Sequence, residues 1–224
     1  MRNLLLFAAF TGCALAAQAQ VSQFPDIAGS TYKLPVTSLK QARLTGTVLQ
    51  QLDFSCGSAA LATLLTHHYG YPVSEQAILE AMYAKGDQPK IQREGFSLLD
   101  MKRYLEGLGF SADGFKQPLD KLLEARLPAV VLINESGYHH FVVIKGLDKD
   151  RVLIGDPAKG LRAVSRKNFE STWVGGLLFV IHNRMEQARF NRQADWQAVP
   201  RAPMLAAREG LAGAGLAKHG PGDF

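Results

Sequence analysis

A cysteine stands at the start of a run of small and apolar residues in the stretch QQLDFSCGSAALATLL, residues 50–65. This run is typical of a buried helix, and Asp53 or Ser55 can cap its start. Cys56 then lies in the first turn, where unpaired backbone N–H groups lower the pKa of a thiol and favour the nucleophilic thiolate. Gly57 beside it allows a backbone or a substrate to approach closely. We therefore take Cys56 as the candidate nucleophile.

Attack of a thiolate on a carbonyl carbon also needs hydrogen-bond donors for the oxyanion that develops. The backbone N–H of Cys56 is one such donor. The side-chain amide of Gln50, in the loop before the helix, can provide a second donor. Gln51 is the adjacent alternative.

A nucleophilic cysteine needs a base, and the 6 histidines of the chain are His67, His68, His139, His140, His182 and His219. We expect His67 and His68, about three turns along the cysteine's own helix, to be one surface and one packed histidine. His140 directly precedes the apolar run FVVIKG, at a strand start from which a side chain can project into a cleft. His140 is the preferred base, and His139 and His182 are the alternatives.

An imidazole base needs an acceptor that orients it. Asp156, in the stretch DPAKG, ends the strand that follows His140. A hairpin of HFVVIKG with RVLIGDP returns the end of the second strand to the start of the first, which places Asp156 near His140. An Asp-Pro pair alone usually just begins a turn, so the combination carries more weight than this one element.

The elements that position these residues are predicted in an α+β order, with helices first and antiparallel strands second. Helical patterns cover residues 56–70, 73–84, 96–109 and 118–125, with Ser74 as an N-cap and a capping box from Ser97 to Asp100. Short β-branched runs predict strands over residues 129–134, 140–147, 151–156 and 176–182, with an edge strand at 161–165 and a helical turn at 166–173.

The first residues are typical of a secretory signal peptide, with a basic start at Arg2, an apolar run from Leu4 and an A-x-A pattern that ends at Ala19. We expect cleavage after Ala19 and a periplasmic protein; a lipoprotein anchor at Cys13 is less favoured, because the A-x-A pattern beyond it makes the better cleavage site. Cleavage would leave Cys56 as a lone thiol in a compartment that favours disulfides. A lone thiol there is either buried and inert or reactive.

Four segments are expected: a signal peptide over residues 1–19, an extended arm over 20–46, a folded domain over 47–183, and an Arg/Ala/Gly-rich tail over 184–224. The formal net charge is +5 and the basic residues are scattered, so nucleic acid is not an expected partner. No apolar run after the signal reaches the ~20 residues that a membrane span needs. No histidine or cysteine cluster has metal-ligand spacing, so neither a metal nor another cofactor is expected.

Three stretches, LQQLDFSCGSAALATLL, HFVVIKGLDKDRVLIGDPAKG and FESTWVGGLLFVI, together resemble the bacteriocin-processing cysteine peptidases, a papain-like family. Its better known members form the N-terminal domain of ABC transporters and cut after a double glycine in leader peptides. The resemblance covers residues 46–182 and implies a papain-like fold with N-terminal helices packed on a C-terminal antiparallel sheet. It also implies that Cys56 is the nucleophile, His140 the base, Asp156 its orienting acid and Gln50 the oxyanion donor, by the Q-x5-C-G spacing.

Two departures refine this resemblance. Ser55 stands where the transporter members usually carry an acidic residue, and the chain has neither membrane helices nor a G-x-x-x-x-G-K-[ST] loop for a fused ATPase. It therefore resembles the stand-alone exported members, which include peptidases of functional-amyloid (Fap) secretion systems. The implied function is a thiol protease that cleaves a secreted polypeptide, such as an amyloid or secretion component. An acyltransferase, or a peptide-binding module without turnover, is the alternative.

Overall fold

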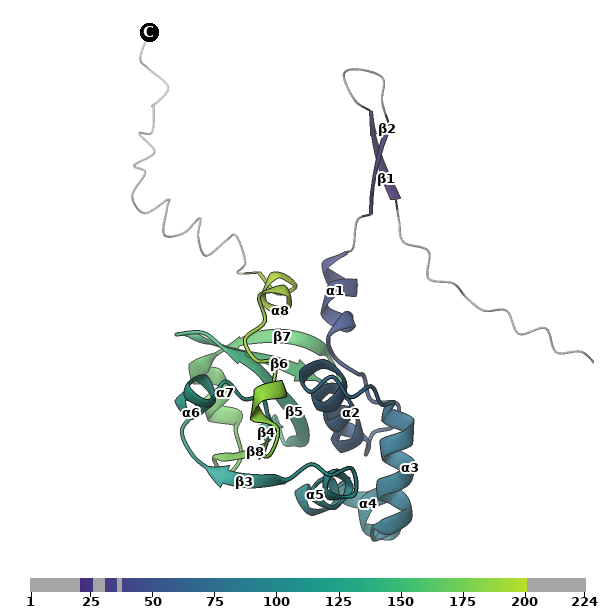
Figure 1. Cartoon of the computed structure of the whole chain (residues 1–224), viewed down its shortest axis with the longest axis vertical. Coiled ribbons are helices and arrows are strands. Elements are labelled where there is room, and N and C mark those ends of the chain that lie inside the picture. The colour runs from purple at the N-terminus through teal and green to yellow at the C-terminus, as the bar shows by residue number, and fades with distance from the viewer. Residues whose placement is uncertain (1–20, 26–30, 36–37, 201–224) are drawn as a thin grey trace, which may run out of the picture. The chain divides into compact units, whose positions relative to one another are not determined.

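The structure is a computed structural model that describes residues 21–25, 31–35 and 38–200 (Figure 1). The predicted signal peptide, Cys13 and His219 lie outside the described residues. The chain divides into two units, residues 1–38 and residues 39–224. In the first unit, strands β1 (Val21–Pro25) and β2 (Thr31–Pro35) form an antiparallel pair in which each strand ends at a proline. The segment is therefore extended, as predicted, but it is also paired.

The second unit is built on one antiparallel sheet with the strand order β3-β8-β4-β5-β6-β7. The strands are β3 (Ala112–Lys116), β4 (Ala129–Glu135), β5 (Tyr138–Leu147), β6 (Arg151–Asp156), β7 (Gly160–Ser165) and β8 (Leu177–Ile181). The predicted strands β4 to β8 are all present, and β7 is the predicted edge strand. Strand β3 was not predicted, because ADGFK has a glycine and a lysine in place of an apolar alternation.

The helices of the second unit are α1 (Leu39–Thr45), α2 (Cys56–Thr63), α3 (Glu75–Lys85), α4 (Gln88–Glu94), α5 (Leu98–Gly107), α6 (Asp120–Ala125), α7 (Arg166–Thr172) and α8 (Gln193–Gln197). Helix α2 continues as a π-helical turn over Leu64–His68, and a short 3-10 turn covers Met185–Gln187. Figure 1 shows α2 to α5 gathered on one side of the sheet and α6 with α7 on the other.

Two predicted helix starts have the expected chemistry. Ser74 accepts a hydrogen bond from the backbone N–H of Ala77, and Ser97 forms the complete capping box with Asp100. These caps satisfy backbone donors that a helix leaves without partners in its first turn. They therefore fix where α3 and α5 begin.

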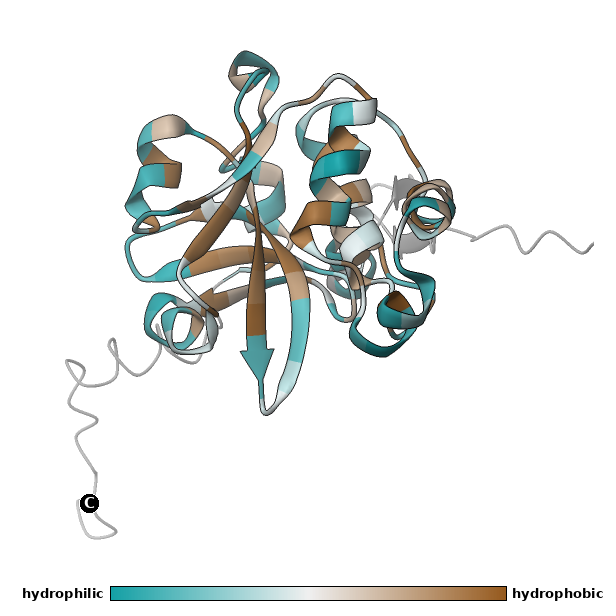
Figure 2. Ribbon diagram, turned by 90° about the horizontal axis from the view of Figure 1, so that it is seen from below, coloured by the Kyte–Doolittle hydropathy of each residue, from teal (hydrophilic) through white to brown (hydrophobic). Residues whose placement is uncertain are grey.

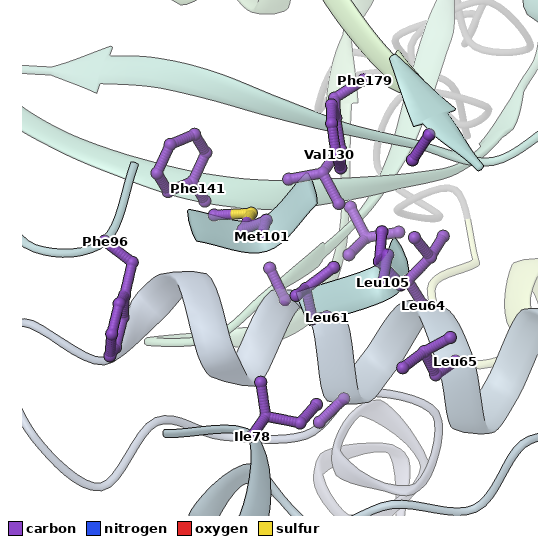
Figure 3. Packing of buried hydrophobic residues seen from close by; sticks show 14 of the residues in the cluster. Leu61, Leu64, Leu65, Ile78, Phe96, Met101, Leu105, Val130, Phe141 and Phe179 are labelled. Carbon is purple, nitrogen blue, oxygen red and sulfur yellow. The ribbon is translucent and has the colours of Figure 1, made fainter. Parts of the chain in front are cut away.

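The strands alternate their side chains between two cores, so both faces of the sheet are buried. On β5, Phe141 and Val143 pack with the α2, α3 and α5 helices, whereas Val142 and Ile144 pack with α6 and α7. Figure 3 shows the first core, in which Leu61 of α2 and Leu64 of the π-helical turn cluster with Met101 of α5 and with the sheet. In Figure 2 the central strands are brown over most of their length, and the helices carry both brown and teal. A sheet buried on both faces reads as continuous apolar runs, as the sequence does here.

The folded unit extends beyond both ends of the predicted domain. Residues 39–45 form helix α1 where an extended arm was predicted, and this helix contacts β7. At the other end, residues 184–200 belong to the folded unit rather than to a tail: the backbone N–H of Asn191 donates to the carbonyl of Lys145, and Val199 is buried. The sequence prediction missed this because the segment has no apolar period. Polar contacts hold it, together with Ala198 and Val199, which pack against Leu153 and Leu161.

Two buried polar residues hold this C-terminal segment. Lys145 of β5 is fully buried; its ammonium donates to the carbonyl of Gly46 at 2.5 Å and lies 3.4 Å from a carboxylate oxygen of Asp195. His68 is also buried, and its Nδ1 donates to the carbonyl of Arg189. The expected packed histidine of the His67–His68 pair is therefore His68.

Candidate active site

Cys56 is the first residue of helix α2, as predicted, and it is a buried free thiol with 7% of its surface exposed. Ser55 occupies the N-cap position, but its hydroxyl makes no capping bond. It donates instead to the carbonyl of Leu52 at 3.0 Å and accepts from the N–H of the same residue. The Ser55 hydroxyl thus does not occupy the backbone N–H groups at the start of α2, which can donate to the sulfur of Cys56 or to the carbonyl oxygen of a substrate.

Burial raises the pKa of the Cys56 thiol more than its surroundings lower it. The backbone N–H groups of Phe141, Gly57 and Cys56 itself favour the thiolate, while the charge of Asp156 opposes it. The helix N-terminus acts in the predicted direction, but removal from water outweighs it, so the predicted lowering of the pKa is wrong for this state. A thiol of raised pKa needs a base to become nucleophilic.

Gly57 has a packing role that its neighbours in the sequence do not indicate. A Cβ atom at this position would lie 2.8 Å from Cε of Met101 and 3.1 Å from Cβ of Phe96. The close approach that this glycine allows is therefore to Met101 of α5 and to Phe96, two residues before the start of that helix. It sets how deeply the cysteine end of α2 sits in the core.

His140 and Asp156 meet as the hairpin geometry predicted. Nε2 of His140 donates to Oδ2 of Asp156 at 3.3 Å, and both side chains are almost completely buried. Nδ1 of His140 is buried and has no hydrogen-bond partner among the described residues. The ring thus presents a bare nitrogen, which can accept a proton, while its other nitrogen is fixed by a carboxylate. The backbone N–H of the next residue, Phe141, acts on the Cys56 sulfur, which places the two halves of the site side by side.

Asp156 is held ionised in spite of its burial. Burial raises its pKa, but hydrogen bonds from His140 and from the N–H of Ala158, with the charges of Arg162 and His140, outweigh this and lower the pKa to about 2. The Ala158 N–H donates to Oδ1 at 2.9 Å. The carboxylate therefore stays charged at neutral pH.

Gln50 lies half-buried in the loop before α2 and is tied to the loop after Asp156. Its backbone N–H donates to the carbonyl of Pro157 at 2.9 Å, and its side-chain Nε2 donates to the carbonyl of Leu52 at 3.0 Å. Nε2 also donates to the carbonyl of Asp53 at 3.5 Å, and Oε1 is buried without a hydrogen-bond partner among the described residues. Donation to an oxyanion therefore requires the amide to exchange one of these two carbonyls, the longer bond to Asp53 first. Gln51 is exposed.

The alternative histidines lie apart from this cluster. His139 is exposed and points away from the buried His140, its neighbour on the strand. His182 donates from Nε2 to Asp113 of β3 at 2.8 Å, toward the other end of the strand order. The geometry thus favours His140 over both.

Four residues around His140 were not predicted: Tyr138, Glu135, Lys159 and Arg162. The ring of Tyr138 stacks on that of His140 with centroids 4.9 Å apart. Arg162 donates to Oδ2 of Asp156 from Nε at 3.0 Å and to Glu135 from Nη2 at 2.6 Å. The register of β6 with β7 could have predicted Arg162. It pairs Asp156 with Gly160, so Arg162, two residues further along β7, lies on the same face of the sheet as Asp156.

The described residues contain one group with metal-ligand geometry, formed by Glu135, His140 and Asp156, whose ligand atoms lie within 4.8 Å of one another. The sequence could not indicate it, since the three residues come from three strands. Both carboxylates already bind the guanidinium of Arg162, which supplies positive charge there.

A thiol at a helix start, beside a sheet whose imidazole is oriented by a buried carboxylate, defines a papain-like cysteine peptidase. The chain belongs to the Peptidase C39 family, whose model matches residues 45–185. The predicted family and the α+β papain-like fold are both confirmed. No helix in the described part of the chain is long and apolar enough to cross a bilayer.

The relatives include stand-alone proteins and larger transporters. The chain is 40% identical over 179 residues to a "probable functional amyloid protease" FapD of Pseudomonas fluorescens. This match covers 80% of this chain and 78% of that protein. It is 33% identical over 135 residues to the lactococcin-G-processing and transport ATP-binding protein LagD of Lactococcus lactis, but this match spans only 18% of LagD. Among solved structures, the peptidase domain of Streptococcus ComA matches with a TM-score of 0.51 and 25% identity, over 61% of this chain and 97% of that domain.

Proposed function

We propose that this protein is an exported, periplasmic cysteine endopeptidase that cleaves a secreted polypeptide within a functional-amyloid secretion system. The names of two relatives support the setting: the probable functional amyloid proteases FapD of Pseudomonas fluorescens and Pseudomonas aeruginosa, each 40% identical to this chain over most of its length. The signal-peptide pattern of residues 1–19 supports export.

The reaction assigned to the site uses four residues. His140 takes the thiol proton of Cys56 on Nδ1, and the sulfur attacks the carbonyl carbon of the scissile bond. The backbone N–H of Cys56 and the amide of Gln50 donate to the oxyanion. As the tetrahedral intermediate collapses, His140 returns its proton to the leaving amine and a thioester remains. Water, deprotonated by His140, then releases the acid and restores the thiol.

One observation carries this assignment: His140 is fixed through Nε2 by a buried carboxylate and keeps a buried Nδ1 without a partner. The buried core residue His68 also keeps a nitrogen without a partner, but its other nitrogen is held by a backbone carbonyl. His140 differs because a buried carboxylate holds its ring and the N–H of its neighbour Phe141 acts on the Cys56 sulfur. An oriented imidazole with a bare nitrogen next to a thiol is the arrangement that general-base catalysis needs.

The test compares cells that carry the wild-type chain, Cys56→Ala and Cys13→Ala, with N-terminal mapping of their secreted and periplasmic proteins by mass spectrometry. We expect at least one new N-terminus in wild type and in Cys13→Ala that is lost in Cys56→Ala. Osmotic-shock fractionation should recover the chain in the periplasm with Gln20 as its first residue. Identical N-termini in wild type and Cys56→Ala would overturn the peptidase assignment, and recovery only in the cytoplasm would overturn the location.

A further inference from the structure

The orienting carboxylate of the site has a second partner besides His140. Oδ2 of Asp156 receives hydrogen bonds from His140 at 3.3 Å and from Arg162, whose Nε lies at 3.0 Å and Nη2 at 2.7 Å. Oδ1 receives the backbone N–H of Ala158. Three donors from separate places in the chain thus fix the plane of one fully buried carboxylate. The guanidinium approaches it more closely than the imidazole does.

The guanidinium is in turn balanced by a second carboxylate. Nη2 of Arg162 lies 2.6 Å from Oε1 of Glu135, and the other oxygen of Glu135 lies 2.5 Å from the ammonium of Lys159. The charged groups therefore alternate in sign from Asp156 through Arg162 and Glu135 to Lys159, from the interior to the surface. Glu135 and Arg162 keep 26% and 23% of their side-chain surface exposed, so their charges act at close range without full solvent screening.

The charged groups beside His140 are Asp156, Arg162 and Glu135, with Lys159 one ion pair further out. Tyr138 stacks on the His140 ring, and Glu75 of α3 faces the start of α2 through a hydrogen bond from Ser58. Arg162 is the cation of this set that contacts the orienting carboxylate directly. Its charge opposes that of Asp156, which disfavours the thiolate of Cys56.

We infer that Arg162 is a positioning residue of the reaction, which holds Asp156 against His140 and, with Glu135 as its counter-charge, sets the pH range in which Cys56 reacts. The inference rests on the proposed function, because it assumes that Cys56 and His140 are the reacting groups. Removal of the Arg162 charge should make the thiolate harder to form. Removal of the Glu135 charge should make it easier to form.

The test is the rate of alkylation of Cys56 by iodoacetamide as a function of pH, followed in the full chain by peptide mass spectrometry. For Arg162→Gln we expect the pH of half-maximal reactivity to rise by about half to one unit, as removal of one charge at this range predicts. Arg162→Lys keeps the cation and should stay near wild type. Glu135→Gln should shift the midpoint the opposite way. Arg166→Gln, which breaks an ion pair with Asp120 on the surface, is the matched control and should not shift it.

Each outcome decides the matter. A rate that falls in Arg162→Gln without a shift of the midpoint, or shifts of the same sign in Arg162→Gln and Glu135→Gln, would show a merely structural residue and overturn the inference. If Arg162→Gln does not fold, Glu135→Gln still tests the direction of the shift in the alkylation midpoint. Arg162→Lys then tests whether a cation at this position keeps the midpoint near that of wild type. Failure of the proposed function looks different: alkylation near neutral pH would then be unchanged in His140→Ala.

Discussion

The backbone N–H of Gln50 donates a hydrogen bond to the carbonyl of Pro157, with an N···O distance of 2.9 Å. This bond joins the loop that enters the cysteine helix to the loop that follows Asp156. The two halves of the site are therefore tied by main-chain atoms, and a side-chain substitution at Gln50 leaves the tie intact.

The first prediction follows from this separation of roles. Gln50→Ala removes the amide that is assigned to the oxyanion but not the bond to Pro157. We expect the rate of peptide cleavage to fall by about 10²–10³-fold, since one oxyanion donor is lost. Alkylation of Cys56 by iodoacetamide forms no oxyanion and should be unchanged.

Gln51→Ala is the matched control for that experiment, because Gln51 is the exposed neighbour of the same residue type. It should cleave at the wild-type rate. A greater loss in Gln51→Ala than in Gln50→Ala would transfer the oxyanion role to the second glutamine.

The second prediction concerns the three histidines that the sequence left as alternatives. His140→Ala should lower cleavage by about 10²–10⁴-fold, the range for loss of a positioned general base. His139→Ala and His182→Ala should retain cleavage, since His139 is exposed and His182 is engaged with Asp113. Initial rates on the polypeptide identified in the Cys56→Ala comparison measure this. Full activity of His140→Ala would make the base assignment wrong.

The third prediction is a dependence of stability on pH that originates in Asp156. Its pKa is about 2 in the folded state against a reference value of 3.8, so the folded state binds the proton less tightly than the unfolded state. The stabilisation is therefore complete above pH of about 4 and is lost as the pH falls toward 2; it amounts to roughly 2 kcal/mol. Denaturant titrations of wild type and Asp156→Asn between pH 2 and 6 check this.

In that experiment the difference in unfolding free energy between the two proteins should be largest at pH 6 and should shrink toward pH 2. A difference that is constant over the whole range would contradict the linkage. It would instead point to a loss of packing or of neutral hydrogen bonds.

The fourth prediction concerns the buried ion pair of Lys145 with Asp195. Asp195→Asn leaves the fully buried ammonium without its counter-charge, which should destabilise the fold by about 3 kcal/mol. The control is Asp120→Asn, which breaks the exposed pair with Arg166 and should cost no more than about 1 kcal/mol. Thermal unfolding measures both. Equal small losses would show that Lys145 is neutralised in another way.

Much of the fold and site was accessible from the sequence because it depends on local pattern. The capping box of Ser97 and the β-branched runs specify elements through neighbours in the chain. The His140–Asp156 contact followed from hairpin geometry alone. What could not be predicted depends on partners that are distant in sequence.

Arg162 shows that limit. Its position on an edge strand is predictable, but its two carboxylates come from β4 and β6, and no local pattern names them. Likewise the raised pKa of Cys56 results from the depth at which α2 is packed, which Gly57 and its contacts with α5 determine. Burial depends on how all the elements pack together, so the residue types near the cysteine predicted the wrong direction for the shift of its pKa.

The attachment of residues 184–200 has a practical consequence for where the chain can be shortened. A protein that ends at residue 183 would lose Asp195, Asn191 and the carbonyl of Arg189 together, which leaves Lys145 without its counter-ion and His68 without its acceptor. Lys145 lies on β5, the strand that carries His140, and His68 ends the π-helical turn that continues the helix of Cys56. A catalytically competent fragment is therefore expected to retain Asp195, which lies beyond the last residue of the family match at 185.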